Sequence, residues 1–221
     1  MIRAPKSEPS PTKPNHQRPA SSIVFLDIDD VLCMSSPYGG FAAIAAVNGQ
    51  HANPAAVYRQ LFAAGAVNAL RRVHEEMHAR VHYVISSTWR ESFSREQLEV
   101  VFRQSGLGFV ADGLVEGTAW RTPVKFRLSQ RVDEIAQWLS QHHRGEPFVI
   151  VDDTHSGASL LRALKVRPGV KPHPFAGRVV LCQENVGLTD AHVPDIVDAL
   201  GREVIRPTAP DGMAMGNEEQ R

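Results

Sequence analysis

The sequence has few cysteines, no net charge and no long apolar run. Cys33 and Cys182 are the only cysteines among 221 residues, which excludes a disulfide scaffold and fits a reducing compartment. Lysine plus arginine and aspartate plus glutamate each number 24, which argues against nucleic-acid binding through bulk positive charge but leaves a local basic groove open. No apolar run approaches the roughly 20 residues of a membrane span, and the first residues lack the apolar core of a secretory signal. We expect a cytoplasmic protein with no membrane partner.

Both ends of the chain lack the apolar residues that a folded core needs. Residues 1–21 hold five prolines among serine, lysine and arginine, and residues 207–221 are similarly polar. Segments of this composition cannot bury enough surface to fold, so we expect two disordered tails, the first of them proline-rich. Residues 22–206 contain no low-complexity break and no obvious repeat, and we predict that they form one domain.

Four short apolar runs alternate with helical patterns in this domain. The runs, rich in Val, Ile, Leu or Phe, predict buried strands over residues 23–26, 81–85, 147–151 and 178–181. Apolar residues at helical spacing predict helices over about 67–77, 132–139 and 196–200, with further helical segments over 54–64 and 95–104. The alternation predicts an α/β fold, a three-layer Rossmann-like parallel sheet with helices on both faces.

Polar residues follow three of the predicted strands at their carboxyl ends. They are Asp27, Asp29 and Asp30 after the first strand, residues 86–90 after the second, and Asp152 and Asp153 after the third. Because these ends meet at one edge of a parallel sheet, we expect the side chains to converge. Several carboxylates at close range repel one another, and oxygen ligands without His or Cys favour Mg²⁺ over Zn²⁺. The sequence therefore predicts a magnesium site.

Taken in order, these motifs resemble the haloacid dehalogenase (HAD) superfamily of phosphohydrolases over about residues 22–200. The motifs that carry the resemblance are Asp-Ile-Asp-Asp-Val-Leu at 27–32, Ser-Ser-Thr-Trp-Arg at 86–90, a basic stretch at 125–131 and Asp-Asp at 152–153. The second of them is also similar to a narrower subgroup, as are Glu-Ile-Ala-Gln-Trp-Leu at 134–139 and Gly-Leu-Thr at 187–189. That subgroup comprises small HAD domains, some of them in bacterial RNA-repair proteins of Swiss army knife architecture.

The resemblance implies a Mg²⁺-dependent phosphohydrolase that forms an aspartyl-phosphate. Asp27 would be the nucleophile, and Asp29 would protonate the leaving oxygen and then activate water. We expect the neighbouring Asp27 to raise the proton affinity of Asp29. The Mg²⁺ ion would be held by the Asp27 carboxylate, the Asp29 carbonyl, and Asp152 or Asp153. Asp30 departs from the family pattern, which usually has glycine there.

The resemblance leaves two roles open between neighbouring residues. A serine hydroxyl should bind the phosphoryl group, and we assign Ser87, or Ser86 if the register shifts by one. A basic residue should offset the charge of the transition state. We assign Lys125, which has the expected residue type, although Arg131 has the better spacing to the following helix. The substrate contacts that the resemblance implies come from Ser86, Thr88, Arg90 and Arg131.

The segments that would carry a cap domain are short. Residues 33–65 and 91–123 are too small for an independent cap, so we expect a small cap or none. Gly39, Gly40 and Phe41 could form a mobile lip at the entrance. An open site suits a bulky phosphorylated substrate such as a nucleotide, a nucleic-acid end or a phosphoprotein, or a site that a partner subunit closes. We expect Trp89 to pack in the core rather than to stack on a base.

Two alternatives to a HAD phosphatase remain from the sequence. The first is a catalytically weak relative that acts as a binding or regulatory module. The second is a zinc hydrolase, because His74-Glu75-Glu76-Met77-His78 matches the H-E-x-x-H pattern of zinc proteases. Glu76 is a charged residue where that pattern usually has none, so a partly exposed histidine pair flanking the buried helix face is the simpler interpretation.

Overall fold

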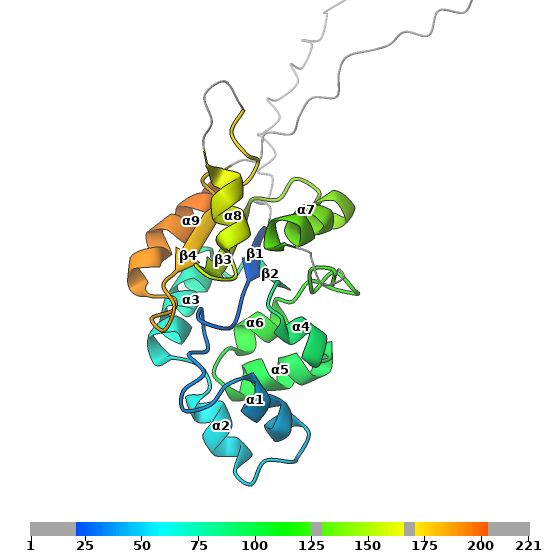
Figure 1. The fold of residues 1–221 in the computed structure, drawn as a ribbon, viewed down its shortest axis with the longest axis vertical. Helices are drawn as coiled ribbons and strands as arrows, with labels where there is room; N and C mark the ends of the chain where they lie inside the picture. Colours follow the sequence, from blue (N-terminus) through cyan, green and yellow to red (C-terminus); the bar gives the residue numbers. More distant parts are fainter. Residues whose placement is uncertain (1–20, 125–129, 166–170, 203–221) are drawn as a thin grey trace, which may run out of the picture.

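The computed structural model describes residues 21–124, 130–165 and 171–202, and its centre is a four-stranded parallel sheet (Figure 1). The strands lie in the order β2-β1-β3-β4. They are β1 (Ser22–Leu26), β2 (Val81–Ile85), β3 (Phe148–Asp153) and β4 (Val179–Cys182). All four predicted strands are present, and the α/β fold class is confirmed. The third strand runs two residues further than expected, because Asp152 and Asp153 pair with Leu181 and Cys182 of β4.

Helices separate the strands along the chain. They are α1 (Gly40–Val47), α2 (Pro54–Gln60), α3 (Ala64–Glu76), α4 (Trp89–Ser92), α5 (Arg95–Gln104), α6 (Gly108–Asp112), α7 (Arg131–His142), α8 (Ala158–Leu164) and α9 (Val193–Gly201), with a 3₁₀ turn at Asp190–His192. A capping box at Ser94 and Gln97 fixes the start of α5. None of the described helices combines the length and the apolar composition that crossing a lipid bilayer requires.

The helices cover both faces of the sheet, which gives the three layers that the sequence predicts. Side chains alternate along each strand, so β1 sends Val24 and Leu26 to one face and Ile23 and Phe25 to the other. The first face packs against apolar residues of α3 and α9, and the second against α7 and α8. Beyond the first face, α1, α2 and α5 contact one another and form the helical group at the lower end of Figure 1.

The segment expected to form an entrance lip is instead the start of a helix. Gly40 and Phe41 open α1, whose Ala43 and Ala46 are buried in the core. The apolar residues that follow Gly40 give α1 a face to bury, and packing outweighs the weak helix propensity of glycine.

The connections between strands diverge between β1 and β3. The chain leaves β1 and reaches β2 by way of α3 on one face, whereas it passes from β3 to β4 by way of α8 on the other. Adjacent strands whose connections diverge in this way leave a space at their carboxyl ends, where α/β proteins bind ligands. Asp27 and Asp152 stand at this point.

Candidate active site

Four polar residues form one row across the carboxyl edge of the sheet. Leu26 pairs with Ile85 on one side and Val151 on the other, so the next positions place Asp27 between Ser86 and Asp152. Thr122 extends the row, because its amide donates to the Ile85 carbonyl at 3.0 Å. Asp27, Ser86 and Asp152 continue the alternation that sends Phe25 and the equivalent residues of β2 and β3 toward α7.

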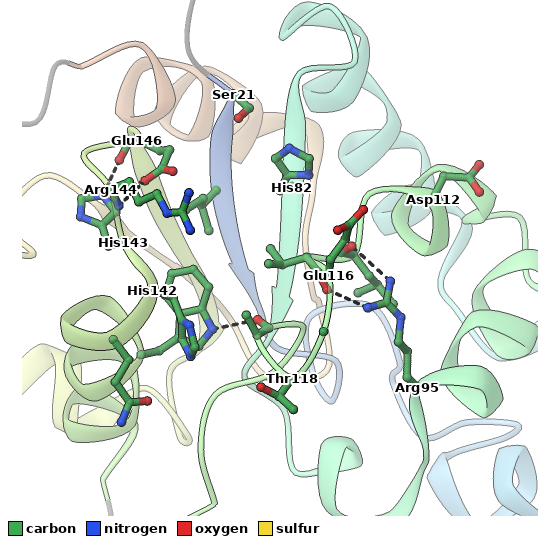
Figure 2. Close-up of a pocket in the computed structure, with 17 residues that line it drawn as sticks. Ser21, His82, Arg95, Asp112, Glu116, Thr118, His142, His143, Arg144 and Glu146 are labelled. Atoms are coloured by element: carbon green, nitrogen blue, oxygen red, sulfur yellow. Dashed lines mark hydrogen bonds and ion pairs between the residues drawn. The ribbon is translucent and has the colours of Figure 1, made fainter.

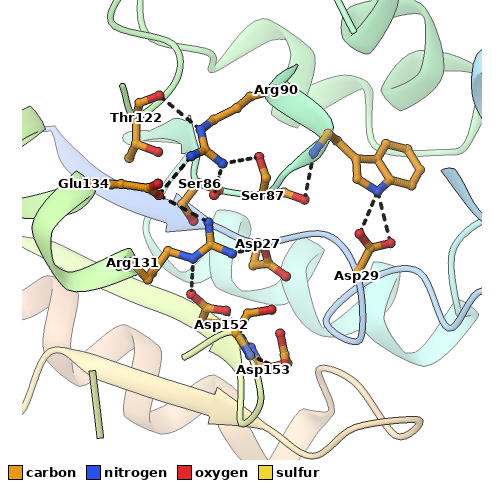
Figure 3. Close-up of polar contacts among 12 residues, drawn as sticks. Asp27, Asp29, Ser86, Ser87, Arg90, Thr122, Arg131, Glu134, Asp152 and Asp153 are labelled. Atoms are coloured by element: carbon orange, nitrogen blue, oxygen red, sulfur yellow. Dashed lines mark hydrogen bonds and ion pairs between the residues drawn. The ribbon is translucent and has the colours of Figure 1, made fainter. Parts of the chain in front are cut away.

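The three carboxylates of Asp27, Asp152 and Asp153 make a buried acidic cluster, shown in Figure 3. Each offers an oxygen within 4.8 Å of the other two. Among the described residues, this is the one group of three or more His, Cys, Asp or Glu side chains close enough to share a metal ion. The turn after β3 holds Asp153 in place, since its Oδ1 accepts bonds from the amides of His155 and Ser156 at 2.6 and 3.0 Å.

Arg131, the first residue of α7, joins two members of the cluster. Its Nη2 donates to Asp27 Oδ1 at 2.8 Å and its Nε donates to Asp152 Oδ2 at 2.7 Å. The guanidinium is buried, as are both carboxylates. Two charge-assisted bonds from one planar group fix the relative positions of the two acids. The basic stretch therefore reaches the site at Arg131, while Lys125 lies outside the described residues.

Burial disfavours the fully ionised state of the acidic cluster. Burial, followed by the charge of Asp152, raises the pKa of Asp27 well above its usual range, although Arg131 opposes the shift. Burial also raises the pKa of Asp152 to about 6, again against the effect of Arg131. Asp27 Oδ2 is buried and accepts no hydrogen bond from the described residues. Oxygen donors of this kind, with one unpartnered, fit a Mg²⁺ ion.

Asp29 lies apart from the cluster and is held by an indole. Trp89 Nε1 donates to both carboxylate oxygens of Asp29 at 3.0 Å, and Figure 3 shows Asp29 beside the row. The pKa of Asp29 is raised, as we expected, but the cause differs. Burial contributes most, the Trp89 bond opposes it, and the charges that raise the pKa belong to Asp30 and Asp153 rather than to Asp27. Trp89 is buried in the core, as expected, and also positions Asp29.

The two candidate serines differ in what their hydroxyls contact. Ser86 Oγ is buried and has no hydrogen-bond partner among the described residues. Ser87 Oγ accepts a bond from the Trp89 amide at 3.3 Å, so it supports the turn into α4. Thr122 Oγ1 is also buried and has no hydrogen-bond partner within the part of the chain that the structure describes. No pattern in the sequence pointed to it. Thr88 is exposed beside this loop.

Arg90 does not project toward a substrate site, contrary to our expectation. Its guanidinium points inward, where it donates to the carbonyls of Ser86, Ser87 and Thr122 at 2.7, 2.7 and 3.1 Å and to Glu134 Oε2 at 2.9 Å. Figure 3 shows these bonds beside Arg131. Arg90 therefore holds the loop after β2 in shape. Glu134 also lies 3.8 Å from Arg131, a partner that the three-residue spacing on α7 could have indicated.

The loop after β1 is fixed by the segment that follows β4. Asp30 has a φ of 52°, the left-handed region that suits the glycine usual in the family, and its Oδ1 accepts a bond from the Asn185 amide at 2.8 Å. Leu188 donates to the Val31 carbonyl at 2.9 Å. Gly187 has a φ of 76°, and a Cβ there would lie 2.8 Å from the Val31 oxygen. This contact requires glycine.

The zinc alternative fails because the helix ends too early. The i, i+4 histidine pair needs one continuous helix, but α3 stops at Glu76 and His78 has a φ of 54°. His74 instead packs against Tyr83 and Phe109 and lies 3.3 Å from the Tyr83 hydroxyl. The two histidines therefore do not share a helix face that could hold a metal ion.

A separate cavity of about 750 Å³ lies away from the acidic cluster (Figure 2). Ser21, Ile23 and His82 line it from the amino-terminal parts of β1 and β2, and residues 141–144 line it from the end of α7. Ligands of α/β sheets bind at the carboxyl ends of the strands. We therefore assign the candidate site to the acidic cluster rather than to this larger cavity.

The fold and the site together define a HAD-type domain. Its parallel sheet carries aspartates after the first strand and at the end of the third, and a helix between motifs supplies an arginine to both. The family model "HAD domain in Swiss Army Knife RNA repair proteins" matches residues 23–193, and the chain belongs to this family. No curated protein and no solved structure matches the chain. Membership of the family supports a phosphohydrolase of the HAD type.

Proposed function

We propose that the domain is a Mg²⁺-dependent phosphomonoesterase that acts through an aspartyl-phosphate on Asp27. The observation that carries the proposal is the state of Asp27. One oxygen is held by Arg131, and the other is buried, unpartnered and beside two further carboxylates. A structural carboxylate would be expected to have both oxygens satisfied when buried. An oxygen left free at a ligand-binding edge is suited to attack a phosphoryl group.

In the proposed first step, an oxygen of Asp27 forms a bond to phosphorus while the bond to the leaving oxygen breaks. Asp29 supplies the proton that the leaving oxygen needs, and its raised pKa makes a carboxylic acid more available near neutral pH. In the second step Asp29 takes a proton from water, whose oxygen attacks phosphorus and releases phosphate from Asp27. Trp89 orients Asp29 in both steps through its indole N–H.

Neighbouring residues would bind the phosphoryl oxygens and balance charge. We assign the hydroxyl role to Ser86 rather than Ser87, because Ser86 Oγ is free and stands beside Asp27 in the row. We assign the basic role to Arg131, which already contacts Asp27. Asp27, Asp152, Asp153 and the Asp29 carbonyl would hold Mg²⁺, which when bound neutralises phosphate charge and orients the phosphoryl group.

The substrate we propose is a phosphomonoester at a nucleotide or a nucleic-acid end, inside the cytoplasm. The description of the family, which places it in RNA repair proteins, supports an RNA end. The absence of an independent cap among the described residues agrees with a substrate too large to be enclosed.

Hydrolysis of a generic aryl phosphate by the full chain, with and without Mg²⁺, tests the chemistry. Wild type should turn over only with Mg²⁺, and Asp27→Asn should lower kcat by at least about 10³-fold because the nucleophile is lost. Ser87→Ala serves as the matched control, since its hydroxyl supports a turn, and it should retain far more activity than Ser86→Ala. Activity that survives in Asp27→Asn would refute the mechanism.

Inactivity in a folded wild type that binds Mg²⁺ would instead favour the regulatory-module alternative. Phosphorylated RNA and DNA oligonucleotides then decide between a selective enzyme and a binding module, because a selective enzyme would release phosphate from one of them.

A further inference from the structure

A groove of about 710 Å³ opens directly beside Asp29. Its walls come from the loop after β1, the first turns of α1, and α4. Asp29 itself lines the groove, together with Trp89, the residue that orients it. The groove is therefore continuous with the proposed reaction site rather than a separate cavity.

The groove has aromatic walls. Trp89 and Phe93 stack with ring centroids 5.1 Å apart and planes at 13°, and both are buried at its base. Tyr38 and Phe41 also line the groove. Phe41 is 94% exposed, so its ring gains nothing from folding. An exposed aromatic ring that lines a groove offers a face on which a planar group can stack.

The charge of the groove restricts what can enter it. The described residues that line it include the carboxylates of Asp29 and Glu91 but no lysine or arginine, and the hydroxyls of Ser35, Thr88 and Ser92 add hydrogen-bonding groups. A further phosphate would meet only negative charge here. An uncharged planar group with polar edges would find aromatic faces on which to stack and hydroxyls to bond.

We propose that the groove binds the nucleobase of the phosphorylated nucleoside, with Phe41 as a stacking residue that sets specificity. The proposal rests on the proposed function, because Asp29 is the acid that protonates the leaving oxygen. Whatever carries that oxygen must lie next to Asp29, and the groove is the space adjoining it. The volume of the groove falls in the range of small-molecule sites. Base stacking on aromatic side chains is strong and tolerates any base.

The test compares a nucleoside monophosphate with glycerol phosphate, which has no aromatic leaving group. In Mg²⁺, wild type should favour the nucleotide in kcat/KM, and Phe41→Ala should reduce the ratio of the two kcat/KM values by about tenfold or more. Leu161→Ala is the matched control. It removes an apolar side chain that is 45% exposed on α8, outside the groove, and should leave the ratio unchanged. Oligonucleotides with one terminal phosphate, assayed in parallel, separate a strand end from a free nucleotide as the source of the base.

Equilibrium binding of the same nucleotide to wild type and Phe41→Ala distinguishes failure of the groove from failure of the chemistry. If wild type turns over both substrates and neither the ratio nor the binding depends on Phe41, the groove proposal is overturned and the proposed function stands. If binding depends on Phe41 but no substrate is hydrolysed, the proposed function fails and the groove stands. A preference for a phosphotyrosine peptide over every nucleotide would also overturn the groove proposal.

Discussion

A buried arginine lies on each side of the carboxyl end of β1, and the two arginines bond different partners. On the β2 side, Arg90 bonds three backbone carbonyls and Glu134. On the β3 side, Arg131 bonds the carboxylates of Asp27 and Asp152. Glu134 lies within 4 Å of both guanidinium groups. Both guanidinium groups are buried, and they differ in the groups that they bond.

This difference distinguishes a structural role from a role in the reaction within one network of charged groups. Backbone carbonyls cannot gain a proton near neutral pH, and Arg90 bonds three of them, so the loop depends on Arg90. The carboxylates that Arg131 holds can gain a proton or bind Mg²⁺. Loss of Arg90 should therefore cost folding stability, and loss of Arg131 should cost activity.

Replacement of Arg90 should have the largest effect. Arg90→Met leaves three carbonyls and Glu134 without their buried donor, which should lower the free energy of unfolding by about 3–5 kcal/mol. Denaturant unfolding measures the change. The control is Arg103→Met, whose side chain is 48% exposed and pairs with Asp112; it should cost no more than about 1 kcal/mol. Equal stability of the two variants would contradict the structural role assigned to Arg90.

Replacement of Arg131 should act mainly on the reaction. Arg131→Met should lower kcat by about 10²–10³-fold, the usual cost of a lost donor to transition-state charge. Its loss of stability in Mg²⁺ should be smaller than that of Arg90→Met. Arg131→Lys keeps the charge but not the two-pronged geometry, and its kcat should fall between those of wild type and Arg131→Met. Unchanged kcat with strongly reduced stability would show that both arginines are structural.

The affinity of the acidic cluster for Mg²⁺ should depend on pH, because burial raises the pKa of Asp152 to about 6. Mg²⁺ binds the ionised carboxylate, so protons compete with it and its affinity should fall as the pH drops below 6. We expect the dissociation constant to rise by about tenfold or more between pH 7 and pH 5. Calorimetric titration in two buffers of different ionisation enthalpy should detect proton release near pH 6. A dissociation constant that is flat across this range would contradict the assignment.

The smallest effect is expected at Asp30, which stands where the family usually has glycine. Asp30→Gly relieves the strain of a φ of 52° but loses the acceptor for Asn185, so the two contributions should nearly cancel, within about 1 kcal/mol. Asp30→Ala loses the same bond and keeps the strain, so it should be less stable than Asp30→Gly by about 1 kcal/mol or more. Thermal unfolding measures both variants. The reverse order would mean that backbone strain is unimportant in this loop.

Sequence patterns predicted the sheet well because its strands are simple. The apolar runs of β1 and β3 are buried along their whole length, and those of β2 and β4 in part. Such runs between helical patterns are typical of a parallel sheet. The α1 helix was not predicted because it depends on packing against other helices rather than on a local sequence pattern. Ala43 and Ala46 bury a face that only the neighbouring helices supply. The end of α3 at Glu76 was equally hidden, since the apolar spacing continues to Met77 and gives no stop signal.

Prediction of the site from the sequence is limited in the same way, by contacts that only the folded chain defines. The aspartates at the strand ends were evident from position alone, because parallel strands bring their carboxyl ends together. The choice between Ser86 and Ser87 depends on a one-residue register that only strand pairing defines. The contacts of Arg90 depend on whether its side chain points inward or toward a substrate. The neighbouring polar residues are compatible with either direction. Such assignments need the three-dimensional structure.

The position of β1 in the sheet has a consequence for synthesis of the protein. The strand that carries Asp27 is made first, yet the guanidinium that holds Asp27 lies 104 positions later in the chain, and the amide that fixes Asp30 lies 155 positions later. Contacts of such long range form late and slow the folding of a domain. One edge of β1 can pair with β2 once residue 85 has been made, but the other edge stays unpaired until β3 has been made. A chain released before Asn185 would carry Asp27 without the contact that fixes the neighbouring Asp30.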